Sequence, residues 1–381
     1  MTMHALTNAR VLTARGFFDG QTVVLRDGLV HAVGNDGEFD MQGVEERDLG
    51  GQLLLPGFID IQVNGGGGVM FNDAPSVDGI RAIAAAHRSY GTTGLLPTLI
   101  TDDLDKVATA IAAVDEAIEV GVPGIMGIHL EGPFLNAEKK GVHDANKFRV
   151  LDQSAIRLLS SLRRGKTMAT LAPEMTSPAL IRELAEAGVI VAAGHTNANY
   201  DEVRDALDAG VSGFTHLFNA MSPLTSRAPG VVGAALDDKH SWCGLIVDGY
   251  HVHPAALRIA IASKPRGRCL LVTDAMSSVG AVDKAFELDG QAITVANGKC
   301  VTADGTLAGS DLDMVTAVRN AMSMLDLDAA EAVRMASQYP AEAIGVGDTF
   351  GCIEAGFRAN LALADHDLNV VDTWIDGRPT L

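Results

Sequence analysis

The sequence predicts an α/β protein: a TIM-like (β/α)8 barrel that carries a small β domain built from both ends of the chain. Three observations lead to this fold class. Eight apolar, strand-like runs recur through the middle of the chain. Helix-like stretches separate several of these runs, and alternation of helices with fully apolar strands is typical of a parallel sheet. Short strands with tight turns stand at both ends.

The two ends of the chain share a strand-rich pattern. Residues 1–50 alternate and turn often, and Arg26-Asp27-Gly28 fits a tight hairpin turn between two strands. The last residues also form short strands, with a second turn at Asp376-Gly377. We therefore expect residues 1–52 and 348–381 to build one small β domain together.

Residues 53–347 are predicted to form the barrel. Helix-like segments occur at 76–91 and 177–188. After the last run come a glycine-punctuated, β-like insertion at about 285–308 and amphipathic helices at 311–325 and 328–345. The eight strand-like runs are 53–61, 92–100, 124–130, 167–173, 188–194, 210–216, 243–248 and 269–274. Eight strand–helix units predict closure of the sheet into a barrel.

Composition excludes several classes of partner. The 381 residues are 47% hydrophobic, and 29 basic against 48 acidic residues give a net charge of −19, which argues against nucleic acid and anionic membranes. No stretch approaches the roughly 20 apolar residues of a membrane span, and the N-terminus lacks the apolar core of a signal peptide. The four cysteines show no CxxC spacing, as expected for reduced thiols in a cytoplasmic protein.

Four polar residues stand where apolar runs stop: Glu131, His195, His216 and Asp274. In an α/β barrel, residues that follow the strands point into one shared face, where such folds keep their chemistry. One carboxylate and two imidazoles match the three protein ligands of a catalytic zinc and suit a borderline-soft divalent ion. The set predicts a metal site with an acid/base carboxylate beside it.

Each of these residues also has a structural interpretation. A single histidine at a strand end is more often structural or solvated, but the four residues together favour the metal site. Glu131 is the sharpest case, because a carboxylate after an apolar strand must face a polar pocket or be desolvated at large cost. For His129, two residues earlier, we expect a supporting or structural role.

Other polar residues leave alternatives open. Asp248, His251 and His253 cluster after the seventh run, and we expect at least one of them to reach the pocket. His143 lies in a polar loop, where exposure to solvent and a place in the site are equally compatible with the sequence. Arg227 could bind an anionic group bidentately or stay solvated.

Several motifs together resemble the amidohydrolase superfamily and, within it, the branch of N-acetylglucosamine-6-phosphate deacetylases. They cover the whole barrel, and the ends of the chain fit this family's small β-sandwich. The matching motifs are PGFIDIQVNG (56–65), HLEGPF (129–134), KKGVHD (139–144), GHTNA (194–198), THLFNAMSP (215–223), DGYHVHP (248–254), VTDAM (272–276) and LAGS (307–310).

The resemblance implies hydrolysis of N-acetylglucosamine 6-phosphate to glucosamine 6-phosphate and acetate. It assigns Glu131, His195 and His216 to the metal and Asp274 to acid/base catalysis. In this family an arginine crosses the dimer interface, so the resemblance implies a homodimer in which Arg227 reaches the neighbouring active site. The residues that it assigns to the substrate are His143 at the substrate carbonyl, with Asn219, Ala220, Arg227, His251 and Leu307.

The first barrel run departs from the superfamily pattern. Many relatives carry His-X-His there and bind a second metal, whereas this chain has Gln62-Val63-Asn64. An amide is a much poorer ligand than imidazole for zinc-like ions. No lysine stands at the end of the fourth run to bridge two metals. We expect one divalent metal ion per subunit, zinc first, with iron, cobalt and manganese as alternatives.

Two alternative functions remain open at this point. Another amide hydrolase of the same superfamily would act on a cyclic amide or an N-acyl amino acid. A non-catalytic protein that binds sugar phosphates would keep the barrel without turnover. Asp274 together with three metal ligands argues against the second alternative, because binding alone needs no acid/base carboxylate.

Overall fold

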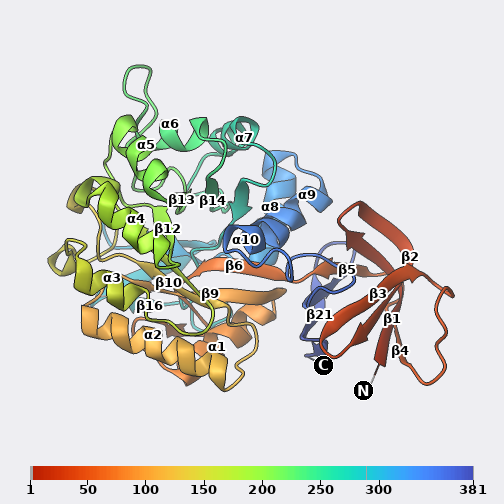
Figure 1. Ribbon diagram of the computed structural model, residues 1–381. Helices are drawn as coiled ribbons and strands as arrows, with labels where there is room; N and C mark the ends of the chain where they lie inside the picture. Colours follow the sequence, from red (N-terminus) through yellow and green to blue (C-terminus); the bar gives the residue numbers. More distant parts are fainter. Residues whose placement is uncertain (1–2, 289, 381) are drawn as a thin grey trace.

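The structure, a computed structural model, describes residues 3–288 and 290–380. Its two parts are a barrel ringed by helices and a strand-rich domain beside it (Figure 1). The first and last strands of the chain lie together in the strand-rich domain, although the whole barrel separates them in sequence. The prediction of a barrel with a β-sandwich built from both ends is confirmed.

The β-sandwich domain buries a small apolar core that includes Leu6, Val23 and Trp374. Its strands follow the order β22-β21-β20-β5-β1-β2-β3, with β4 paired to β1. Both predicted hairpin turns are present: Asp27 and Gly28 have φ of 53° and 80°, and Asp376 and Gly377 have 52° and 72°. The strands are β1 Met3–Thr13, β2 Gly16–Arg26, β3 Leu29–Asn35, β4 Glu45–Asp48, β5 Leu53–Pro56, β20 Leu361–Ala364, β21 Val370–Ile375 and β22 Arg378–Pro379.

The barrel is an eight-stranded parallel sheet, and its strands are adjacent in the order of the sequence. Its first and last strands meet and close the barrel. Val63 and Ala275 form a parallel bridge there, and Asp274 N donates to Gln62 O. The strands are β6 Phe58–Val63, β9 Thr92–Ile100, β10 Gly127–Glu131, β11 Lys166–Leu171, β12 Ile190–Ala193, β13 Val211–Phe214, β14 Trp242–Leu245 and β15 Cys269–Leu271. They are almost entirely buried, as expected for a sheet covered on both faces.

The first strand run is divided between the two sheets. β5 pairs with β1 and β20 of the sandwich, whereas β6 pairs with β9 of the barrel. Gly57 stands between them, and a Cβ there would lie 2.1 Å from Thr93 Oγ1. The prediction of one barrel strand over 53–61 is therefore wrong for residues 53–56. We keep the two-domain division of the chain as a proposal, with the first boundary at Gly57.

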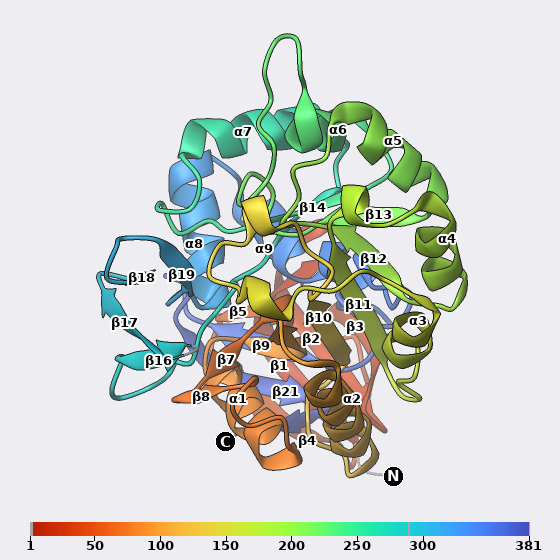
Figure 2. The same ribbon diagram turned by 90° about the vertical axis from the view of Figure 1, so that its left-hand side faces the viewer.

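Helices surround the barrel, as Figure 2 shows end-on. Asn199 and Glu202 form a capping box at the start of α5. The helix expected at 328–345 is divided at Ser337 into α9 and α10. The helices are α1 Val77–Arg88, α2 Leu104–Glu119, α3 Gln153–Leu159, α4 Pro178–Glu186, α5 Tyr200–Ala209, α6 Gly230–Asp237, α7 Pro254–Ser263, α8 Met314–Leu325, α9 Ala329–Ala336 and α10 Gln338–Ala343. Within the described residues, none of them has the length and apolar character needed to cross a bilayer.

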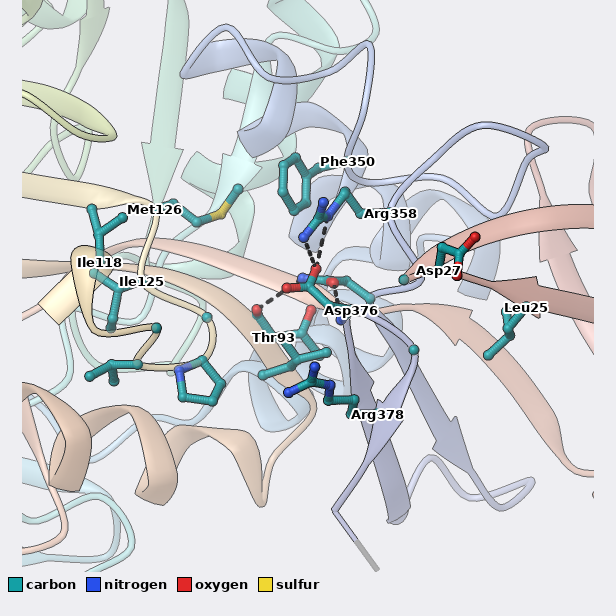
Figure 3. Close-up of a pocket in the computed structure, with 18 of the residues that line it drawn as sticks. Leu25, Asp27, Thr93, Ile118, Ile125, Met126, Phe350, Arg358, Asp376 and Arg378 are labelled. Atoms are coloured by element: carbon teal, nitrogen blue, oxygen red, sulfur yellow. Dashed lines mark hydrogen bonds and ion pairs between the residues drawn. The ribbon is translucent and has the colours of Figure 1, made fainter. Parts of the chain in front are cut away.

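Shorter elements complete the chain. The predicted β-like insertion forms a four-stranded antiparallel sheet beside the barrel mouth. A cavity lies where the β-sandwich meets the amino-terminal ends of the barrel strands (Figure 3). The short elements are β7 Gly65–Gly66, β8 Val69–Met70, β16 Phe286–Leu288, β17 Gln291–Ala296, β18 Lys299–Val301 and β19 Leu307–Ser310, with 3-10 turns η1 Ala137–Lys139, η2 Ala145–Lys147 and η3 Pro173–Met175.

Candidate active site

Four polar residues gather at the carboxyl ends of the barrel strands. Glu131 ends β10, while His195, His216 and Asp274 follow β12, β13 and β15. The last three have positive φ values of 49°, 32° and 53°. Residues other than glycine rarely adopt this conformation, and such strained residues concentrate at functional sites. The backbone thus turns sharply at the end of each of these three strands.

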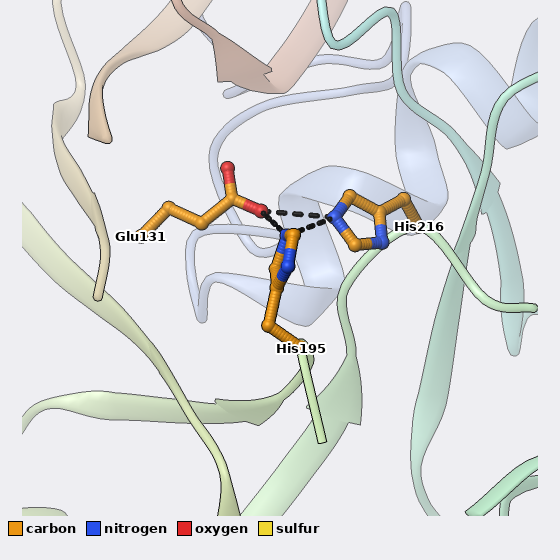
Figure 4. Close-up of side chains that lie close together, drawn as sticks. All are labelled: Glu131, His195 and His216. Carbon is orange, nitrogen blue, oxygen red and sulfur yellow. Dashed lines mark hydrogen bonds and ion pairs between the residues drawn. The ribbon is translucent and has the colours of Figure 1, made fainter. Parts of the chain in front are cut away.

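Three of these side chains converge on one point (Figure 4). Glu131 Oε1 lies 3.2 Å from His195 Nε2 and 2.9 Å from His216 Nε2. The two Nε2 atoms are 3.0 Å apart. All three side chains are buried, and their ligand atoms lie within 4.8 Å of one another. Two imidazoles and a carboxylate are a common ligand set of a catalytic divalent metal.

The hydrogen bonding of His195 indicates that this cluster needs positive charge. His195 Nδ1 lies 2.8 Å from the carbonyl oxygen of Lys139. A carbonyl only accepts, so Nδ1 carries a proton, and in the neutral form that a metal requires the ring would present the lone pair of Nε2. That lone pair faces an oxygen of the Glu131 carboxylate. A cation between the two would relieve their repulsion, while the Lys139 carbonyl orients the ring, as is usual for metal-bound histidine.

The electrostatics of His216 point the same way. Burial lowers the pKa of His216, but the Glu131 carboxylate outweighs burial and leaves that pKa above its usual value. Burial likewise raises the pKa of Glu131, but its contacts with His195 and His216 hold it well below its usual range. The cluster therefore keeps an ionised carboxylate and attracts a cation. The donor set fits a divalent metal ion.

Asp274 lies next to the cluster and is held by two amides. Gln62 Nε2 donates to Asp274 Oδ1 at 3.1 Å, and Asn64 Nδ2 donates to the same oxygen at 2.7 Å. Gln62 Nε2 also lies 3.2 Å from Glu131 Oε2. Burial and the charge of Glu131 raise the pKa of Asp274. Both amides bind one oxygen of the carboxylate, so Oδ2 stays free to take up a proton.

His143 is buried beside the cluster rather than exposed. Its ring meets that of His195 edge to face, with ring centroids 4.3 Å apart. The backbone N–H of Thr101 donates to His143 Nδ1 at 3.4 Å, and the Thr101 hydroxyl lies 2.8 Å from the same atom. Burial holds the pKa of His143 well below its usual value, so the ring is neutral. With Nδ1 as an acceptor, the proton resides on Nε2, which can donate to a ligand.

A cavity of about 380 Å³ joins these groups. His251 reaches it, and its Nδ1 lies 2.6 Å from Asp248 Oδ2. His253 does not line the cavity but caps α7 by accepting from Ala255 N. The sequence-predicted residues that line the cavity are Glu131, His143, His195, His216, Asn219, Ala220, His251, Asp274 and Leu307.

Arg227 is the one predicted site residue outside this cavity. It is exposed and lines a neighbouring hollow of about 530 Å³, together with Tyr200 and Pro223. The loop that precedes α6, which carries Arg227, projects from the barrel (Figures 1 and 2). Within one chain, the structure does not bring Arg227 to the metal cluster.

Two other residues near the site have clear structural roles. His129 lies inside the barrel between Thr98 Oγ1 at 3.2 Å and Thr170 Oγ1 at 2.8 Å. Glu174 follows β11 and accepts hydrogen bonds from the side chains of Asn136 and Thr196. Glu174 thereby ties together the loops that follow β10 and β12. No local pattern in the sequence reveals this role of Glu174, because its partners Asn136 and Thr196 lie 38 and 22 positions away on other loops.

Sequence reasoning also missed what Gln62 and Asn64 do. Their amides identified them as poor metal ligands. Nothing local in the sequence links them to Asp274, which lies 212 positions from Gln62 and 210 from Asn64. Only closure of the barrel brings β6 next to the end of β15.

Two family models, several curated proteins and several solved structures are similar to this chain. A family model described as the amidohydrolase family matches residues 53–380, and one described as the NagA composite domain matches residues 3–54. An N-acetylgalactosamine-6-phosphate deacetylase of Shewanella sp. (strain ANA-3) is 42% identical over 97% of this chain and 94% of its own length. An N-acetylglucosamine-6-phosphate deacetylase of Haemophilus influenzae is 35% identical over 98% of each chain. The crystal structure of N-acetylglucosamine-6-phosphate deacetylase from Pasteurella multocida matches with a TM-score of 0.95 and 37% identity over 99% of both chains.

Proposed function

The chain belongs to the amidohydrolase family, and from that premise we propose that it hydrolyses the acetamide of N-acetylglucosamine 6-phosphate to glucosamine 6-phosphate and acetate. One observation carries the proposal. Glu131, His195 and His216 converge on a point beside Asp274, in a cavity of about 380 Å³. A site of this size lies within the usual range for small ligands. The near full-length similarity to sugar-phosphate deacetylases supports the substrate class.

A second substrate follows from the relatives. The Shewanella relative, at 42% identity, is named for N-acetylgalactosamine 6-phosphate, the C4 epimer of the first substrate. Epimers differ only in the direction of one hydroxyl, and the bond to be broken is the same. N-acetylgalactosamine 6-phosphate is therefore the second candidate.

Glu131, His195 and His216 would hold the metal ion, with zinc as the first candidate and iron, cobalt or manganese as alternatives. When bound, such an ion supplies Lewis acidity, which activates water and polarises a carbonyl oxygen. We infer one ion per subunit, because the amides of Gln62 and Asn64 are poor ligands and already donate to Asp274.

Asp274 and His143 would move and hold the protons of the reaction. Asp274 Oδ2 would accept a proton from the attacking water and return it to the amine nitrogen as the amide bond breaks, since an unprotonated amine is a poor leaving group. Gln62 and Asn64 fix the carboxylate in one orientation for both transfers. His143 Nε2–H would donate to the carbonyl oxygen as negative charge develops there.

Substrate recognition would rest on groups away from the reacting bond. His251, oriented by Asp248, and the backbone around Asn219 and Ala220 line the same cavity as the metal cluster. Leu307 of β19, which lines the same cavity, would pack against the sugar. We propose that Arg227 binds the phosphate of a substrate in a neighbouring subunit, because its projecting loop leaves it exposed and away from the site of its own chain. The enzyme would then be a homodimer.

We propose the cytoplasm as its compartment, in line with four cysteines that are free in the structure. A small-molecule substrate accords with the acidic surface, since nucleic acid and anionic membranes would be repelled by a net charge of −19.

Acetate release from both epimers, with metal content measured on the same purified sample, tests the proposal. We expect rapid turnover of at least one epimer with about one metal ion per chain. A metal-loaded sample that releases no acetate from either, but hydrolyses hydantoin or an N-acetyl amino acid, would move the activity to another amide. Tight binding of the sugar phosphates without acetate release would instead identify a binding protein.

A further inference from the structure

A second cavity lies at the opposite end of the barrel from the metal cluster. Its volume is about 860 Å³, and it occupies the junction between the β-sandwich and the amino-terminal ends of the barrel strands (Figure 3). Thr93, near the start of β9, and Met126, just before β10, line its barrel side. Cavities at domain junctions are preferred places for small-molecule binding. Neither the metal cluster nor the proposed reaction makes use of this cavity.

Arginines give this junction cavity a local cationic character. Arg26, Arg358 and Arg378 line it, against the carboxylates of Asp27 and Asp376. Arg358 is neutralised, since its Nε donates to Asp376 Oδ1 at 2.8 Å. Among the described residues, the exposed side chains of Arg26 and Arg378 have no hydrogen-bond or ion-pair partner. On a chain with a net charge of −19, two such guanidinium groups at one cavity favour an anion.

Two hairpin turns bring these arginines to the same cavity. The first turn has the order Arg26-Asp27-Gly28, and the second has Asp376-Gly377-Arg378. The turns abut, because a Cβ added at Gly28 would lie 3.3 Å from the carbonyl oxygen of Asp376. Ala359 joins them further: its N–H donates to Gly28 O, and its carbonyl accepts from Gly377 N. The two arginines are therefore carried by a braced backbone rather than by free loops.

The remaining wall suits the body of a small polar molecule. Ile118, Ile125 and Phe350 give it apolar surface, as the side chains in Figure 3 show. Asn360 is 9% exposed and bridges the two domains: its Nδ2 donates to Thr93 O, and its Oδ1 accepts from Asp376 N. A simple phosphate ion would leave most of such a cavity empty. The ligand must therefore carry a body as well as a charge.

We propose that the junction cavity binds a small phosphate monoester, with its phosphate held by Arg26 and Arg378 and its body against the wall of Ile118, Ile125 and Phe350. Arg–phosphate contacts are commonly bidentate, which gives direction as well as charge. The site is separate from the metal cluster, and the proposal does not depend on which amide the enzyme hydrolyses.

Titration calorimetry of the whole metal-loaded protein with glucose 6-phosphate tests the proposal, because this probe has a phosphate and a sugar body but no acetamide to hydrolyse. We expect a binding event that Arg26→Ala/Arg378→Ala weakens at least tenfold and that Arg227→Ala preserves. Arg182→Ala, an exposed arginine on α4, serves as the matched control and should bind as the wild type does. Deacetylation by the double variant should stay within about twofold of wild type, which separates this site from the proposed reaction.

Inorganic phosphate is the second probe. We expect it to bind at least about tenfold more weakly than glucose 6-phosphate, a difference of about 1.4 kcal/mol. Equal affinities would overturn the assignment of the apolar wall. Unchanged glucose 6-phosphate binding in the double variant, or binding lost only in Arg227→Ala, would overturn the site itself. If the double variant does not fold, Arg378→Glu alone makes the same test, because it reverses one exposed charge of the pair.

Discussion

The Nε2 atoms of His195 and His216 lie 3.0 Å apart at the carboxyl ends of the barrel strands. In the neutral forms that metal binding requires, both nitrogens offer lone pairs to the same point, and the Glu131 carboxylate completes the set. Such a cluster is costly when buried without a cation. The stability of this site and its activity should therefore both depend on metal.

Removal of the metal should abolish acetate release and lower the melting temperature, since a ligand that binds only the folded state stabilises it. One equivalent of Zn²⁺ per chain should restore both, as measured by elemental analysis and thermal unfolding. Glu131→Gln should lose the metal and reduce kcat/KM at least about a thousandfold, because several kcal/mol of charge stabilisation disappear. Glu116→Gln, an exposed residue on α2, is the matched control. A stoichiometry of two would contradict the single site.

Asp274→Asn should retain metal and substrate binding but lose turnover, because its Oδ1 can still accept from Gln62 and Asn64 while no carboxylate remains to take the proton. We expect kcat to fall by about 10²–10⁴. Elemental analysis and equilibrium binding of the substrate should stay near wild type. Asp237→Asn, at the exposed end of α6, controls for the change of charge. Near-normal turnover would remove Asp274 from its acid/base role.

Arg227→Ala should chiefly raise KM for the phosphorylated sugar, since phosphate contacts contribute binding energy remote from the reacting bond. We expect an increase of roughly tenfold or more, for the loss of one charge-assisted hydrogen-bonded contact. The rate on unphosphorylated N-acetylglucosamine should change little. A fall in kcat at unchanged KM would show that Arg227 does not hold the phosphate. Mixed dimers of Arg227→Ala and Asp274→Asn chains would regain part of the activity if the arginine acts across the interface.

Asp60 should make stability fall as pH rises toward neutrality. It is buried inside the barrel, and burial raises its pKa from 3.8 to about 7, although the hydroxyl of Thr273 and backbone N–H groups partly offset this. The folded protein therefore keeps a proton that the unfolded chain has already lost. This contribution is fully present below about pH 4 and is lost as pH rises through about 7.

Asp60→Asn should remove that pH dependence, because an amide stays neutral. Relative to wild type, the variant should gain on the order of 4 kcal/mol in free energy of unfolding between pH 4 and pH 8, at about 1.4 kcal/mol per pKa unit. Denaturant unfolding at several pH values measures the difference, and only its change with pH is diagnostic. Asp105→Asn, at an exposed position in α2, serves as the matched control for the change of charge. A constant difference for Asp60→Asn as well would contradict the raised pKa.

The sequence by itself predicted the barrel and singled out the three residues of the buried Glu131, His195 and His216 cluster. Strands of a parallel barrel are apolar along their whole length, so a charged residue directly after such a run stands out, as Glu131 and His216 do. Since all carboxyl ends of the strands meet at one face, separate motifs could be assigned to one site before their distances were known. The two hairpin turns could also be predicted from the sequence, because such turns need positive φ angles, which Asp-Gly adopts readily.

The tertiary structure alone decided how these parts meet. It placed the ring of His143 against that of His195 instead of in solvent. It brought the side-chain amides of Gln62 and Asn64 within hydrogen-bonding distance of Asp274. It also paired residues 53–56 with strands of the sandwich sheet. It also left Arg227 outside the cavity of its own chain. Each of these outcomes depends on contacts between segments distant in sequence. Local patterns record which side of an element is buried, but not which element it meets.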